Sequence, residues 1–184
     1  TSEPERGALA RLGRQGGYAV ERSVHMDEHS IENQLPFLQF IHPHARIVPV
    51  GVGALGLDEA RQLAAELAGL VRDAGEGAVL LGTTDFSHEG PSYGGPELPM
   101  NEITELTRRK DAPLLQAVLA MDAARLLELG CGSSMCGAGA AAVLLLTCRE
   151  LGLSRAELLR YLVNTEVTPC GSTTGFASFA FCSP

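Results

Sequence analysis

The sequence has 184 residues, of which 45% are apolar and 20% charged, as expected for a single compact domain spanning residues 1–184. The net charge of −8 argues against nucleic-acid binding, and the longest apolar run, residues 138–147, is much shorter than the ~20 residues of a membrane helix. The five cysteines show no repeated C-x-x-C pairing, so neither a disulfide framework nor a zinc knuckle is predicted, and we expect a cytoplasmic protein.

The N-terminal part of the chain is predicted to be helical over residues 4–15, with a short extended piece at 18–24. A second helix is expected to begin near Asp27 or Ser30, either of which can serve as its N-cap. Pro36 has no amide hydrogen, so it indicates a kink in this helix or a restart with Pro36 in the first turn.

A dense polar patch accompanies the start of this helix, made up of His25, Asp27, Glu28, His29 and Glu32. Side chains three residues apart meet on a helical turn, so Glu32 can orient the His29 imidazole as a base or a metal ligand. A capping motif with an exposed His–Glu pair explains the same residues. His42 and His44 have the spacing of a metal pair, but Pro43 between them favours an exposed loop.

The next segment has the pattern of a β-strand, a helix and a second β-strand. The β-branched residues of 46–52 predict a strand, and Asp58 is expected to cap an amphipathic helix that follows it. A short apolar run at 78–82 predicts the second strand. At this length the three elements indicate a right-handed βαβ unit with parallel strands, and hence an α/β fold.

Directly after this second strand comes a polar turn that carries Asp85, His88 and Glu89. In open α/β sheets, ligands bind at the carboxyl ends of the strands, so a carboxylate and an imidazole at this position are well placed for catalysis or metal binding. The alternative is a surface turn in which Asp85 caps a backbone amide and His88 is solvated.

The second half of the chain is predicted to be mainly helical. After a Pro/Gly-rich loop or lid, helices are expected over 101–110, continuing through 120, and over 122–129, with Asp122 as the N-cap of the latter. A buried Ala/Leu helix follows Cys136, and two strands, 156–165 and 175–181, end the chain.

Cys136 lies at the turn that opens the buried helix, where aligned amides stabilise a thiolate that can attack electrophiles or bind metals. It is therefore the cysteine that we single out for chemistry. Cys148, inside the buried helix, and Cys182, in the last strand, are expected to be small core residues. Cys131 is compatible with either role.

Three patches stand together in the sequence: MDEHSIENQLPFLQ (26–39), TTDFSHEG (83–90) and MCGAGAAAVL (135–144). In this order and approximate spacing they resemble the Memo-like family, whose microbial members are often described as protein B of the AmmeMemoRadiSam system. The final NTEVTP and STTGFASFAF segments are also similar to that family's C-terminal strand. The resemblance extends over nearly the entire chain.

The resemblance implies a fold similar to that of class III extradiol dioxygenases, which are non-haem iron enzymes with a mixed, mostly parallel sheet flanked by helices. It further implies that Asp85, His88 and Cys136 match family pocket residues, with Cys136 as a metal ligand. Family members carry roughly a hundred more residues upstream, by the size expected of such a domain. These include H-A-G-Y and G-P-S-H segments whose histidines complete the metal site. We therefore expect an N-terminally truncated version of the fold, in which His88, His29 or another chain would have to complete the ligand set.

The leading hypothesis is a metal-dependent, dioxygenase-like oxidoreductase. Cys136 and His88 are its predicted metal-binding residues, with Fe(II) as the cofactor and Cu or Zn as alternatives. His88 is the predicted acid/base, and Asp85 is predicted to orient it. His29 and Glu28 complete the candidate catalytic set as residues that are expected to support this pair.

Two alternatives belong to other classes. The first is a non-catalytic module that uses a relic of the metal site to bind a peptide or protein. The second is a cysteine hydrolase, which needs Cys136 within hydrogen-bonding reach of His88. The expected partners are a small-molecule or peptide ligand, the radical-SAM and AMMECR-like proteins of the same system, and a second copy of the chain. No nucleic acid or membrane is expected as a partner.

Overall fold

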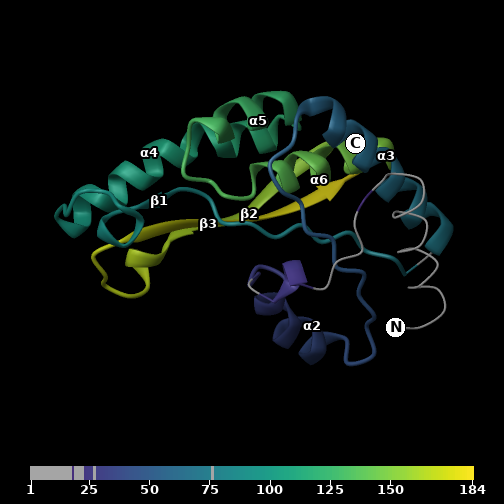
Figure 1. The fold of residues 1–184 in the computed structure, drawn as a ribbon, viewed down its shortest axis with the longest axis horizontal. Coiled ribbons are helices and arrows are strands. Elements are labelled where there is room, and N and C mark those ends of the chain that lie inside the picture. The colour runs from purple at the N-terminus through teal and green to yellow at the C-terminus, as the bar shows by residue number, and fades with distance from the viewer. Residues whose placement is uncertain (1–17, 19–22, 27, 76) are drawn as a thin grey trace.

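The computed structural model describes residues 18, 23–26, 28–75 and 77–184. Four helices, α3 (Leu57–Ala74), α4 (Met100–Leu119), α5 (Ala123–Cys131) and α6 (Ala138–Glu150), lie along one side of a small sheet, whereas the shorter α2 (Leu35–Ile41) lies apart from them, below the sheet in Figure 1. Short 3₁₀ helices occur at η1 (Ser23–His25), η2 (Glu32–Gln34), η3 (Pro91–Tyr93) and η4 (Asn164–Glu166).

The sheet has three strands in the order β1-β3-β2, and both pairings are antiparallel. β2 (Arg155–Val163) and β3 (Thr173–Cys182) form a long hairpin, interrupted by a register shift between Leu158 and Arg160. β1 (His88–Glu89) is only two residues long, and His88 lies opposite Thr174 of β3. The sheet thus connects the 83–90 motif directly to the C-terminal strand.

The core lies between the sheet and the helices. Leu114 of α4, Leu126 of α5 and Leu145 of α6 are almost completely buried together, and Phe179 of β3 packs against their cluster. Burial of one such leucine side chain stabilises the fold by roughly 1.5–3 kcal/mol. α6 is apolar around most of its surface because it lies between this cluster and a second one, formed with α3.

The predicted helices of the second half and the two C-terminal strands are confirmed. The 101–110 helix does continue, giving one helix, α4, with Pro113 inside it. Asp122 is the N-cap of α5, and its side chain accepts a hydrogen bond of 2.9 Å from the Arg125 amide. α5 ends at Cys131, two residues beyond the predicted end of this helix at residue 129. Pro36 lies in the first turn of α2, which is one of its two predicted positions.

The predicted βαβ unit is wrong, and with it the mostly parallel sheet. Residues 46–52 and 78–82 are not strands, and every strand pairing among the described residues is antiparallel. Both segments instead rest on the helices: Val52 packs in the cluster formed by α3 and α6, and Gly82 lies against Leu144. A β-branched pattern indicates a segment that fits a half-buried surface, but it does not determine which strand lies beside it.

The start of α3 also differs from its prediction. Gly56, not Asp58, is the N-cap, and its amide donates a 2.7 Å hydrogen bond to the Glu59 side chain. Asp58 lies in the first turn, where it pairs with Arg61 at 2.9 Å. A carboxylate is favourable anywhere in the first turn of a helix, so its presence there does not fix the cap position.

The N-terminal predictions are tested only in part. The helix predicted over 4–15, and Asp27 as a cap, lie outside the described residues. Val24 belongs to η1, so the predicted extended piece does not continue through it. Ser30 does not cap α2, which begins five residues later after η2. None of the helices in the described part of the chain combines the length and the apolar character of a membrane-spanning segment.

Candidate functional site

The 83–90 motif is attached to the centre of the sheet through its main chain. The Phe86 amide donates to the Gly175 carbonyl at 3.0 Å, and the Gly175 amide donates to the Ser87 carbonyl at 3.0 Å. Phe86 and Ser87 are buried by this pairing. Asp85 and His88, on either side of the two buried residues, remain partly accessible.

His88 is held by three hydrogen bonds. Its amide donates to the Ser134 hydroxyl at 2.8 Å, and its ring atom Nδ1 lies 2.8 Å from the Ser134 main-chain oxygen. Its other ring nitrogen, Nε2, lies 3.3 Å from Oδ2 of Asp85. Because a carbonyl oxygen only accepts hydrogen bonds, Nδ1 must carry a hydrogen, and a neutral His88 then has its lone pair on Nε2.

Asp85 and His88 Nε2 can therefore form a hydrogen bond only when one of the two groups carries an additional proton. The Nε2 lone pair and the Asp85 carboxylate are both acceptors, so a hydrogen bond between them requires a proton on one of the two atoms. The His88 side chain is 14% exposed and that of Asp85 is 45% exposed. Nε2 is therefore the ring nitrogen through which His88 can exchange a proton, and the Asp85 carboxylate beside it is partly exposed.

The Pro/Gly-rich loop predicted as a lid does contact the site. The ring of Tyr93, in η3, packs against the His88 ring with 4.8 Å between centroids, and its hydroxyl lies 3.1 Å from the Thr174 hydroxyl oxygen. Gly90, which precedes η3, has a φ of +101°, and a Cβ there would lie 2.7 Å from Ile103 Cδ1 and 2.8 Å from the Gly171 carbonyl oxygen, so the chain can turn into η3 at this point only with a glycine.

An ion pair between Lys110 and Glu89 lies beside the Ser134 hydroxyl. Lys110 of α4 lies 2.5 Å from a carboxylate oxygen of Glu89, which is nearly buried, and the Ser134 hydroxyl is 3.4 Å from the same oxygen. The Ser134 hydroxyl therefore lies between Glu89 and the His88 amide. This arrangement links α4, β1 and the loop before α6 around one histidine.

Asp111 of α4 is a fully buried carboxyl group that the sequence analysis did not single out. It accepts hydrogen bonds from the Ser87 amide at 2.9 Å and from the Tyr161 hydroxyl at 2.8 Å. Burial, and then the hydrogen bond to Asp111, raise the pKa of Tyr161 above its ordinary value. Asp111 thus fixes the main chain immediately before His88. Its sequence signal is its spacing, since it lies at the helical interval from Thr107 and Leu114 on the buried face of α4.

Cys136 is exposed and comes directly before Gly137, the N-cap of α6. Gly137 lies against Thr84 so closely that an added Cβ would be 2.0 Å from the Thr84 hydroxyl oxygen. The Cys136 turn therefore packs against the side chain of Thr84, the residue directly before Asp85. Burial raises the pKa of Cys148 to about 11, so the prediction of an inert core cysteine in α6 is confirmed.

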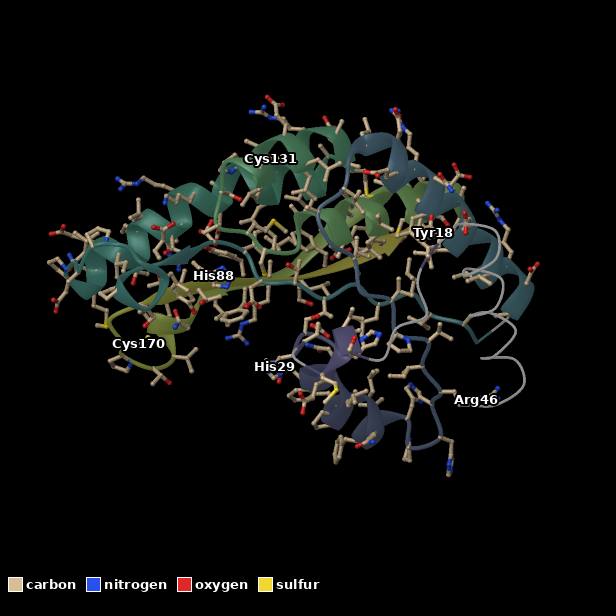
Figure 2. The ribbon with its side chains drawn as sticks, viewed as in Figure 1. Tyr18, His29, Arg46, His88, Cys131 and Cys170 are labelled. Atoms are coloured by element: carbon tan, nitrogen blue, oxygen red, sulfur yellow. The ribbon has the colours of Figure 1, made fainter. Side chains whose placement is uncertain are left out.

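Glu28 and His29 lie near this site without contacting Asp85 or His88 in the described part of the chain. His29 Nδ1 is 3.1 Å from Glu32 Oε2, and both side chains are at least 70% exposed, so the alternative of a surface His–Glu pair describes them. Partial burial raises the pKa of Glu28, but hydrogen bonds from Ser30 and from the Ile31 amide outweigh it and lower the pKa overall. Figure 2 shows His29 on the lower segment and His88 beside the sheet.

A hydroxyl group joins the two segments. The Thr83 hydroxyl donates to the Ser30 carbonyl and accepts from the Gln34 amide group, both at 3.4 Å. The three sequence patches are therefore neighbours in space, with 83–85 in the middle. Thr83, Thr84, Tyr93 and Ser134 are the residues at these junctions that the sequence analysis did not assign to the site.

The described side chains do not by themselves form a metal site. No three His, Cys, Asp or Glu side chains come together within residues 18, 23–26, 28–75 and 77–184 in a way that could hold an ion. Both ring nitrogens of His88 have partners, whereas the Cys136 thiol has none among these residues. His42 and His44 lie in an exposed turn, as predicted.

Comparison with known proteins assigns the chain to a family. The family model described as Memo-like protein matches residues 8–180. A MEMO1 family protein of Methanopyrus kandleri is 29% identical over 178 residues, which make up 95% of this chain and 59% of the relative. MEMO1 family proteins of Archaeoglobus fulgidus and Methanosarcina acetivorans are 30% and 32% identical, over 89% and 84% of this chain and 58% and 55% of their own lengths.

The chain thus spans little more than half the length of the relatives that it matches. The family match nevertheless includes nearly all of its residues, and the three patches around Thr83 all lie within it. The chain therefore belongs to the Memo-like protein family.

Proposed function

We propose that the chain carries the proton-transfer part of a Memo-like oxidoreductase pocket, in which His88 is the acid/base and Asp85 is its partner. The observation that carries this proposal is the 2.8 Å contact between His88 Nδ1 and the Ser134 carbonyl. It fixes the tautomer, so that only Nε2 exchanges a proton. Asp85 stabilises the protonated ring through Nε2, and release of that proton leaves a base directed at the same point.

The metal belongs to the same proposal, as a group that the family resemblance implies. Fe(II), with Cu or Zn as alternatives, would polarise a bound substrate. The described side chains do not fit an ion on their own, so we derive no step through it. Cys136 is the side chain best suited to contribute a ligand, because its thiol is exposed and has no partner among the described residues, whereas both ring nitrogens of His88 are engaged.

Oxygen uptake under reducing conditions tests the proposal, with catechol as the probe of dioxygenase-like chemistry; the chain is mixed with the portion of the Methanopyrus kandleri relative outside the matched region, to supply the ligands that the described side chains lack, and is then loaded with Fe(II). We expect uptake by the unmodified chain, its loss in His88→Gln, and its retention in His44→Gln, which changes an exposed histidine outside the site. Metal content is measured in parallel for Cys136→Ser and for the control Cys170→Ser, which alters an exposed thiol in the β2–β3 loop (Figure 2). Uptake that persists in His88→Gln, or none in the unmodified chain, contradicts the proposal.

A non-catalytic module that binds a peptide or protein is the second candidate function. It is favoured by α2, which buries none of its residues and leaves Phe37, Phe40 and Ile41 more than 60% exposed. In that case, substitutions at Asp85, His88 and Cys136 leave partner binding unchanged, whereas Phe40→Ser weakens it. The cysteine hydrolase is disfavoured, because no hydrogen bond joins Cys136 to His88 in the described part of the chain.

A further inference from the structure

The hydrogen bonds of the neutral His88 ring do not by themselves fix its plane. Nδ1 donates to the Ser134 carbonyl at 2.8 Å, whereas Nε2 and the Asp85 carboxylate, 3.3 Å apart, are both acceptors in that state. The torsion that turns an imidazole about its Cβ–Cγ bond has broad minima. One hydrogen bond at the edge of the ring therefore lets the ring rock, and Nε2 can move away from Asp85. A further contact with the ring itself is needed to hold its plane.

Tyr93 makes such a contact. The centroids of the Tyr93 and His88 rings are 4.8 Å apart and their planes are inclined by 55°, a separation at which aromatic rings attract each other. The His88 side chain is only 14% exposed, whereas Tyr93 is 52% exposed. Because about half of Tyr93 remains in contact with solvent, burial alone does little to keep its ring in this place. Other contacts have to hold Tyr93 against the imidazole.

The main chain around Tyr93 forms a closed turn, residues 90–95, which we call the strap. The amides of Tyr93 and Gly95 both donate to the Gly90 carbonyl, at 2.9 and 3.0 Å. Gly94 has a φ of +75°, a left-handed conformation that glycine adopts without strain. The chain thus leaves Gly90 and returns to it within five residues, so that Tyr93 belongs to one short unit.

Two hydrogen bonds attach the strap to the start of β3. The Ser92 amide donates to the Ser172 hydroxyl at 3.0 Å, and the Tyr93 hydroxyl lies 3.1 Å from the Thr174 hydroxyl oxygen. Thr174 is 5% exposed, and its amide donates to the side-chain oxygen of Asn164 at 2.9 Å. The partner of the Tyr93 hydroxyl is therefore itself held firmly in the sheet.

Thr174 is also the residue opposite His88 in the pairing of β1 with β3. Residues that lie opposite each other in an antiparallel pair have their side chains on the same face of the sheet. This relationship explains how one tyrosine can pack its ring on His88 while its hydroxyl reaches Thr174. The position of Tyr93 relative to the imidazole is thus set by the sheet as well as by the strap.

We propose that Tyr93 is a positioning residue for His88: its ring, held in place by the Thr174 hydroxyl, fixes the plane of the imidazole and keeps Nε2 directed at Asp85 when His88 is neutral. The part of His88 as an acid/base rests on the proposed function, whereas the control of its ring orientation does not. A base that keeps its orientation after it has released a proton is ready to accept the next one.

Nitrogen-15 shifts of the imidazoles in the 184-residue chain test this proposal under mildly alkaline conditions, where histidine side chains are ordinarily neutral. The signals that disappear in His88→Gln are those of His88. In the unmodified chain, Nδ1 and Nε2 should differ widely, as in a single tautomer. In Tyr93→Leu the ring should leave the Ser134 carbonyl more often, so that the minor tautomer increases about two- to tenfold, the effect of losing one contact between aromatic rings.

Tyr93→Phe and Thr174→Val remove the same hydrogen bond from its two ends. Each variant keeps a ring at residue 93, so each should increase the minor tautomer less than Tyr93→Leu does. The double variant should show the effect of one single variant and not their sum, because only one contact is lost. The matched control is Phe176→Leu, which removes an exposed ring from the same strand as Thr174 and should leave the His88 shifts unchanged.

Unchanged His88 shifts in Tyr93→Leu would overturn the proposal, and so would an equal change in the Phe176→Leu control. Circular dichroism checks that each variant is folded. If Tyr93→Leu does not fold, Tyr93→Phe and Thr174→Val decide the matter, because additive effects, or no effect, contradict the proposed link through Thr174. Oxygen uptake decides separately on the acid/base: if the unmodified chain shows none while the shifts change as expected, the proposed function fails and the positioning role of Tyr93 holds.

Discussion

Gly175 of β3 lies directly against the buried carboxyl group of Asp111 on α4. A Cβ on residue 175 would be 1.8 Å from Asp111 Oδ2 and 3.3 Å from Cβ of Phe86. This contact allows the carboxyl group to reach the Ser87 amide, and it joins α4, β3 and the motif that ends in His88.

Gly175→Ala should destabilise the fold by roughly 1–3 kcal/mol, the usual effect of overpacking a filled core. Both neighbours resist displacement, because Asp111 is held by two hydrogen bonds and Phe86 belongs to the core cluster. Urea denaturation measures the change. Gly171→Ala is the matched control, since nothing lies within 4 Å of an added Cβ there. Equal stability of the two variants would show that the contact is unimportant.

Asp111→Ala should cost roughly 2–4 kcal/mol, because it leaves the Ser87 amide and the Tyr161 hydroxyl without their acceptor in a buried place. Asp111→Asn should cost less. Its amide oxygen still accepts from Ser87, and the Tyr161 hydroxyl can rotate to accept from the new amide nitrogen. The same denaturation series measures both changes, and an Asn variant as unstable as the Ala variant would contradict this account.

The stability of the fold should fall at alkaline pH through Tyr161. Burial and then Asp111 raise its pKa in the folded protein above the ordinary value of about 10. A group whose folded pKa is raised contributes stability that is complete below the unfolded pKa and is lost as pH rises towards the folded pKa. Unfolding measured from pH 8 to pH 11, an interval set around that ordinary value, should therefore show a decline above about 10. This decline should be smaller in Tyr161→Phe, and identical profiles for the two proteins would exclude the effect.

Ser134→Ala should leave the tautomer of His88 unchanged. The variant loses the hydroxyl that accepts from the His88 amide but keeps the main-chain oxygen that fixes Nδ1. Nitrogen-15 chemical shifts of the imidazole measure the tautomer directly. In Asp85→Asn, by contrast, the shift of Nε2 should move while that of Nδ1 stays in place. A switch of the ring hydrogen to Nε2 in Ser134→Ala would contradict the carbonyl as the orienting group.

The sequence predicted an element correctly where the signals for that element lie within its own residues. The periodic apolar residues of α4, the continuous Ala/Leu run of α6 and the cap at Asp122 are local signals, and those helices were predicted correctly. The parallel sheet was wrong because pairing is not local. Residues 78–82 have the composition of a buried strand, yet they have no ladder partner among the described residues.

Several residues of the site could be predicted from the sequence, but the contacts between them could not. Asp85, His88 and Cys136 follow from residue type and from their position in turns, and their proposed roles await the experiments above. Asp111 was missed because a charged residue in a helix normally faces solvent. Only the fold shows that the Ser87 amide and Tyr161 converge on it.

The shortness of β1 affects how this protein opens. A strand of two residues contributes too few ladder bonds to stay in place by itself, and the residues around it are held by Asp111 and Lys110, both on α4. The histidine segment should therefore form one cooperative unfolding unit with α4 and with the part of β3 around Gly175. A perturbation of the solvent-exposed face of α4, far from the imidazole, would then change how often His88 is in position.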